Sequence, residues 1–177
     1  MALRQNAESD ADMHVSWPRA LAAGAFLPGG GFVYSARPLA GVVAVLAFSF
    51  VRRLSLPASL ALFFSFAVIA AGVAYREGSR DRPIEPRLAP GVVALLAVGL
   101  PVLATLVAGG GFRFLLCGYG QLGNRFVLRA LAFFALSFWV AASGVTIVAS
   151  IVLLLLSGAE ACCFSWREAS SEVVNYA

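Results

Sequence analysis

The sequence predicts an all-α, polytopic integral membrane protein with about four transmembrane helices plus a broken or re-entrant N-terminal helix. Uncharged apolar stretches run from Leu54 to Tyr75, from Leu88 to Ala108 and from Ala130 to Ser157. Each is at least as long as the roughly 20 residues that cross a bilayer as a helix. Charged residues make up 12% of the chain, about half of the ~25% usual in soluble domains. All nine acidic residues lie outside these three stretches.

A single membrane domain, residues 17–157, is expected between a polar N-terminal tail, 1–16, and a polar C-terminal tail, 158–177. The first 16 residues lack the basic start and directly following apolar run of a signal peptide. The first apolar segment is therefore expected to be retained as a membrane element.

That first segment, Ala20–Ala36, is interrupted by four helix-disfavouring residues, namely Pro28, Gly29, Gly30 and Gly31. Proline removes a helical N–H group, and each glycine costs roughly 1 kcal/mol in a helix. Irregular backbone within a membrane is tolerated where it is buried in protein or lines a wet cavity. The segment is therefore predicted to be a half-helix, a re-entrant turn or an interfacial hairpin.

Later segments are also punctuated by proline and glycine. The fourth, Leu88–Ala108, is expected to kink at Pro101 and to stop at three consecutive glycines, Gly109, Gly110 and Gly111. The fifth, Phe126–Ser157, is predicted to be one long tilted helix, because no polar turn divides it. The alternative is an interruption near Ser143 and Gly144.

Arginine distribution predicts an orientation. All 13 basic residues are arginine, and the loop Arg76–Arg87 carries four of them. Short loops rich in positive charge face the cytoplasm. If the first segment does not cross, both termini share the side of this loop, and Arg52, Arg53 and Arg113 lie on the opposite side. If it crosses, the loop moves outside.

The chain lacks residues that several kinds of chemistry require. The chain has no lysine, and His14, its single histidine, lies in the N-terminal tail. No carboxylate or histidine falls in the expected spans, which disfavours proton-coupled transport and haem ligation. Cys117, Cys162 and Cys163 form neither a disulfide framework nor a metal site. The vicinal pair is either acylated at the membrane edge or inert. We expect no catalytic residue, no metal and no cofactor.

Ala142-Ser143-Gly144 resembles the serine box of rhomboid proteases, although Ala141 replaces the first glycine of that motif. A serine needs a base to become a nucleophile, and no histidine follows it. Ser143 and Gly144 are therefore expected to form a small-residue contact between helices. Alanines spaced along the third and fourth segments are expected to do the same: Ala67, Ala70, Ala71 and Ala74, and Ala94, Ala97, Ala104 and Ala108.

Residues 17–41 start with W-P-R-A and continue with L-P-G-G-G, an aromatic residue, Y-S-A-R-P and a glycine. This pattern resembles a small bacterial membrane module that also forms the N-terminal anchor of some type I signal peptidases. Ala70–Arg76 resembles the module's closing D-A-Y-R box without its acid. The resemblance covers residues 17–76 and leaves 88–157 as further helices. It implies an anchor in which Tyr34 and Arg37 sit at the membrane interface. The peptidase's serine–lysine dyad cannot be present, because the chain has no lysine.

A weak internal echo links Gly29–Phe32 with Gly109–Phe112, since both read GGGF. Paired broken segments are typical of inverted-repeat transporters, although the flanks do not otherwise match and coincidence between two glycine-rich stretches is the favoured explanation.

The leading expectation is a non-catalytic protein of a bacterial inner membrane, working as an accessory or assembly subunit of a larger complex. Its partners would be the lipid bilayer and other membrane subunits, with no nucleic acid. The alternative is a small transporter or channel-like protein built around the glycine-rich breaks. An intramembrane enzyme using Ser143 is a weaker third.

Overall fold

The computed structural model describes residues 16–78, 88–109, 116–144 and 147–175. Within these ranges the chain is all-α, as predicted, and contains no strand. Three stretches of helix are long and apolar enough to span a membrane, namely Leu56–Arg76, Pro90–Ala108 and Ile147–Arg167. A shorter apolar helix, Val127–Ala142, accompanies them. The fold is that of a multi-pass membrane protein.

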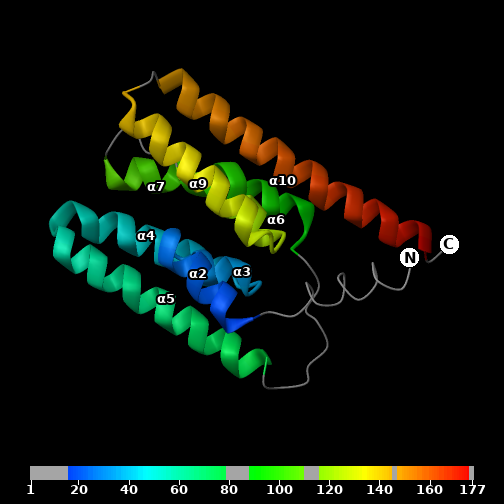
Figure 1. Ribbon diagram of the computed structural model, residues 1–177, viewed down its shortest axis with the longest axis horizontal. Helices are drawn as coiled ribbons and strands as arrows, with labels where there is room; N and C mark the ends of the chain where they lie inside the picture. Colours follow the sequence, from blue (N-terminus) through cyan, green and yellow to red (C-terminus); the bar gives the residue numbers. More distant parts are fainter. Residues whose placement is uncertain (1–15, 79–87, 110–115, 145–146, 176–177) are drawn as a thin grey trace.

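The helices form two halves that pack side by side (Figure 1). The first half contains α2 (Trp17–Phe26), α3 (Gly30–Tyr34), α4 (Pro38–Leu54) and α5 (Leu56–Gly78). The second half contains α6 (Pro90–Ala94), the π-helical turn η1 (Leu95–Gly99), α7 (Leu100–Ala108), α8 (Tyr119–Gly123), α9 (Val127–Ala142) and α10 (Ile147–Asn175). In each half a five-residue helix, α3 or α8, leads into a pair of long antiparallel helices.

The predicted break at Pro28–Gly31 is confirmed. Helix α2 ends at Phe26, Gly29 adopts a left-handed φ of 71°, and α3 starts at Gly30. The chain then runs back along α2, so that the Ser16 N–H group donates to the Tyr34 hydroxyl at 3.5 Å. The segment returns to the end where it entered, which makes it re-entrant. The predicted alanine contact also forms here, because Ala67 lies against Gly24 of α2.

A second turn of the same geometry precedes α8. Gly118 has a left-handed φ of 121°, as Gly29 does before α3. A second left-handed residue follows each short helix, Ala36 in the first half and Arg125 in the second. The closing hydrogen bonds also correspond: Arg37 N–H donates to Phe32 O at 2.9 Å, and Phe126 N–H donates to Gln121 O at 2.8 Å. The repeated unit is therefore Gly29–Pro38 with Gly118–Val127.

The predicted GGGF echo paired the wrong glycines. Gly109, at φ 69°, terminates α7 as predicted and belongs to no short helix. Residues 110–112 of that echo lie outside the described residues. The expected kink near Pro101 takes the form of the π-helical turn Leu95–Gly99 directly before α7. A π turn shifts the hydrogen-bond register, and a proline has no N–H to donate to it.

The expectation of one helix from Phe126 to Ser157 is wrong. Helix α9 ends at Ala142, Gly144 has a left-handed φ of 66°, and α10 begins at Ile147. A left-handed glycine can stop a helix without a polar turn, which the prediction had required. Helix α10 then continues to Asn175, which makes most of the predicted C-terminal tail helical. The split adds one long helix to the four that were expected.

The helix ends gather at two opposite ends of the fold (Figure 1). At one end, the Arg53 guanidinium donates to Leu106 O at 3.1 Å and ties α4 to α7. At the other end lie the starts of α2, α4 and α9 and the ends of α5 and α10. Both described termini and the residues that flank 79–87 therefore lie at one end of the fold. This arrangement agrees with the topology expected if the first segment does not cross the membrane.

Candidate functional site at the junction of the two halves

The two short helices meet at the centre of the fold. The Tyr119 hydroxyl on α8 donates to the Pro28 carbonyl before α3 at 3.0 Å. The break after α2 leaves that carbonyl without a helical partner, and a buried carbonyl must be satisfied elsewhere. Tyr119 is fully buried. Burial raises the pKa of its hydroxyl, which therefore remains protonated and able to donate.

Close backbone packing fills this junction. A Cβ added at Gly30 would lie 2.5 Å from Ala23 O and 2.9 Å from Leu122 Cδ1 of α8. One added at Gly120 would lie 2.6 Å from Ala97 Cβ and 2.7 Å from Ala161 Cβ. Such separations are shorter than van der Waals contact, so Gly30 lets α3 approach α8 of the other half, and Gly120 lets α8 pack against η1 and α10 of its own half.

A polar cluster ties α8 to α10. The buried Gln121 side chain donates from Nε2 to Ser157 O at 2.9 Å and to Glu160 Oε2 at 2.8 Å. The Ser157 hydroxyl donates back to Gln121 Oε1 at 3.2 Å. Asn124 Nδ2 donates to Ala161 O at 2.9 Å. The amides thus hold the short helix against α10 through several hydrogen bonds.

An ion pair extends this cluster to α9. Arg129 Nη1 lies 3.0 Å from Glu160 Oε1, and its guanidinium lies 4.8 Å from the centre of the Phe126 ring. Glu160 falls inside the candidate span Ile147–Arg167. The expectation of spans without carboxylates is therefore wrong, because the apolar helix continues past Ser157. Ionisable groups at membrane depth mark functional sites more often than chance.

Of the predicted interface anchors, only one is exposed. Tyr34 is 1% exposed and packs in the core, and its hydroxyl accepts from the N–H group of Ser16 at the start of α2. Its place at the membrane interface stays a prediction. Arg37 is exposed and directly precedes α4, without a capping hydrogen bond from its side chain.

The remaining predicted residues lie away from the junction. Gly109 lies beneath the Arg53 guanidinium, while Gly110 and Gly111 lie outside the described residues. Ser143 and Gly144 are exposed, and nothing lies within 4 Å of a Cβ placed on Gly144. No helix of the described residues lies against Gly144, so the predicted contact of Ser143 and Gly144 with another helix stays a prediction for a partner chain. The glycine is needed for the left-handed turn.

The cysteines remain apart. Cys117 is buried directly before α8, Cys162 is half-buried and Cys163 is exposed on α10. In the parts of the chain that the structure describes, no group of three or more histidine, cysteine, aspartate or glutamate side chains is placed to hold a metal ion.

No protein-family model, curated protein or solved structure matches this chain. The resemblance to the signal-peptidase anchor therefore stays a prediction. Sequence reasoning missed Gln121, Asn124, Arg129 and Glu160. The available signal was Gly118-Tyr-Gly120, which repeats the glycine spacing of Gly29-Gly-Gly31.

Proposed function

We propose that this chain is a non-catalytic membrane protein that works as an accessory or assembly subunit of a larger complex in a bacterial inner membrane. The filled junction between α3 and α8 carries the proposal. A substrate path between the two repeats would pass where Gly30 of α3 meets Leu122 of α8 and where the Tyr119 hydroxyl meets the Pro28 carbonyl. Backbone and side chains already occupy that space.

The outer surface supports the same proposal. Large apolar side chains face outward from several helices, including Leu128, Phe138 and Trp139 on α9 and Val68 and Ile69 on α5. Such side chains suit lipid or the helices of other subunits. The proposal gives Ser143 no catalytic role, since its hydroxyl donates to Trp139 O of its own helix at 2.7 Å.

The second candidate is a small transporter. Two observations favour it: the matching left-handed glycines before α3 and α8, and the Arg129–Glu160 pair on the apolar helices. Repeats with broken segments and intramembrane charge pairs are features of transporters. For the chain to act as a transporter, the junction between α3 and α8 would have to open.

Purification of the tagged chain in mild detergent, followed by quantitative mass spectrometry, tests the proposal. An accessory subunit is expected to retain the same membrane partners at a constant ratio in two detergents. Recovery of the chain alone in both, together with solute flux into vesicles that contain only this chain, would instead establish the transporter.

A further inference from the structure

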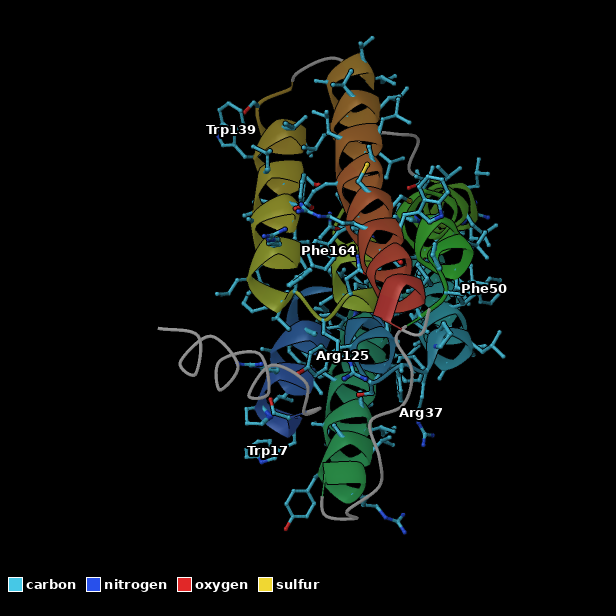
Figure 2. All side chains as sticks on the ribbon, turned by 90° about the vertical axis from the view of Figure 1, so that its right-hand side faces the viewer. Trp17, Arg37, Phe50, Arg125, Trp139 and Phe164 are labelled. Carbon is cyan, nitrogen blue, oxygen red and sulfur yellow. The ribbon has the colours of Figure 1, made fainter. Side chains whose placement is uncertain are left out.

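A cleft of about 280 Å³ opens where the two halves meet at the end that holds the starts of α2 and α9. Arg19 of α2 lines it from the first half, and Asn124, Arg125 and Arg129 line it from the second. Figure 2, viewed toward this end, shows Arg125 between the halves. Three guanidinium groups and one amide thus surround the cleft, and none of the lining residues that the structure describes carries a carboxylate.

The cleft lies at the level where a span ends. Phe126, which also lines it, packs edge-on against Phe164 of α10 with ring centres 4.5 Å apart. Phe164 is close to Arg167, the last residue of the candidate span Ile147–Arg167. Span ends lie beside the lipid headgroups. The cleft is therefore placed at headgroup depth, and Arg129 reaches from it to Glu160 within the span.

Two of the lining side chains are held in position. Asn124 is fixed by its hydrogen bond to Ala161 O, and Arg129 is held between Glu160 and the Phe126 ring. Arg129 keeps further N–H groups beyond the one that Glu160 receives, because a guanidinium carries five.

Arg125 occupies a costly backbone position. Its φ of 64° is left-handed, a region that non-glycine residues adopt rarely. The corresponding residues of the first half, Ser35, Ala36 and Ala40, make the same turn and start the same helix without charge. The equivalent positions in the second half hold Asn124, Arg125 and Arg129. The turn itself therefore does not require the charges.

We propose that this cleft binds a phosphate group, carried either by an anionic phospholipid headgroup or by a small soluble phosphate. Guanidinium groups form bidentate hydrogen bonds with phosphate oxygens. Basic pockets between membrane helices are suited to anionic headgroups. The proposal is independent of the accessory-subunit function.

The test measures ligand-induced thermal stabilisation of the detergent-solubilised chain with phosphatidylglycerol, phosphatidylcholine and sodium phosphate. The variant Arg19→Gln/Arg125→Asn removes one guanidinium from each half, and asparagine tolerates the left-handed backbone. Arg76→Gln is the control, since it removes one exposed charge at the same end, from α5.

We expect phosphatidylglycerol to stabilise the wild-type chain more than phosphatidylcholine, whose choline neutralises its phosphate. Apparent affinity should fall at least about tenfold in the double variant and remain in the control. An equal response to sodium phosphate that the double variant also loses would identify a soluble phosphate as the ligand. Equal responses of the wild type and the double variant, or no response to any phosphate, would overturn the proposal. If the double variant does not fold, Arg19→Gln alone, on a separate helix, provides the same comparison.

Discussion

At the residue scale, the fold depends on a few backbone positions that leave no room for a side chain. Gly30 and Gly31 lie against the carbonyl oxygens of Ala23 and Ala20, so that α3 can run back along α2. The Ala23 carbonyl still accepts from the Leu27 N–H group at 3.1 Å, so α3 packs on α2 without replacing its hydrogen bonds.

Replacing Gly30 with alanine is expected to destabilise the fold by about 1–3 kcal/mol, as overpacking typically does. The added Cβ would meet a backbone oxygen at 2.5 Å, which cannot move as a side chain can. Gly72→Ala is the matched control, because nothing lies within 4 Å of its Cβ and it sits within α5. That change is expected to be neutral or stabilising by up to about 1 kcal/mol. Thermal unfolding in one detergent compares the two, and equal shifts would contradict the packing.

The break at Pro28–Gly31 could be predicted because proline and three glycines act locally, whatever surrounds them. The burial of Tyr34 could not, since tyrosine suits both an interface and a core that offers its hydroxyl a partner. Here Ser16 supplies that partner. Arg125 is missed for a related reason, because nothing in its side chain signals a left-handed backbone.

At the element scale, the helices are joined by one tight turn and one polar cluster. Gly144 lets α9 and α10 pack as an antiparallel pair, and Gln121 with Asn124 fastens α8 to α10. The turn escaped prediction because glycine is also common within transmembrane helices. The cluster escaped because its partners are far apart in the sequence.

Substitutions at Gly144 should follow backbone conformation and not side-chain size. Alanine and leucine are both expected to cost about 1–2 kcal/mol, because each is disfavoured in the left-handed region, and asparagine is expected to cost less. Ser143→Ala should stay within about 0.5 kcal/mol, as exposed changes usually do. Unfolding midpoints of the four variants provide the measurement. A leucine variant much less stable than the alanine variant would show that a neighbouring helix does press on this turn.

Glu160 should serve mainly as a hydrogen-bond acceptor. Glu160→Gln removes the charge but keeps an oxygen for Gln121, and the partly exposed pair with Arg129 is expected to contribute at most about 1 kcal/mol. Glu160→Leu also leaves the buried Gln121 donor without this acceptor and should cost about 1–3 kcal/mol. Chemical unfolding in detergent would rank the two variants. Equal losses would assign the whole effect to charge.

At the scale of the whole molecule, corresponding helices of the two halves make equivalent contacts. Helix α4 of the first half packs on α7 of the second, α9 of the second packs on α2 of the first, and α3 packs on α8. Swapping the halves thus preserves the pattern of neighbours. The sequence predicts the helical membrane class from its apolar stretches. It hides this repeat, because the two turns share glycines at 29 and 118 and at 31 and 120 but little else.

The arrangement of the helix ends leads to a topology prediction. A Ser79→Cys variant without Cys162 and Cys163 should resist an impermeant thiol reagent in intact cells, because the Arg76–Arg87 loop is predicted to be cytoplasmic. A Ser55→Cys control at the opposite end, between α4 and α5, should react. Modification of the Ser79→Cys variant in intact cells would reverse the assigned orientation.

The central claim is that the junction between the halves is closed and stays closed. The variant Cys117→Ser/Leu122→Cys reports on it, because Leu122 of α8 is 1% exposed and lies beside Gly30 of α3 in the other half. Brief treatment of membranes that contain this variant with N-ethylmaleimide, followed by mass spectrometry, measures the exposure of the introduced thiol against that of Cys163, which is exposed on α10. We expect Cys163 to be modified and the introduced thiol to remain unmodified until the chain is denatured. Modification of the introduced thiol at a rate similar to that of Cys163 would show that the junction opens, and would contradict the proposed packing function in favour of transport.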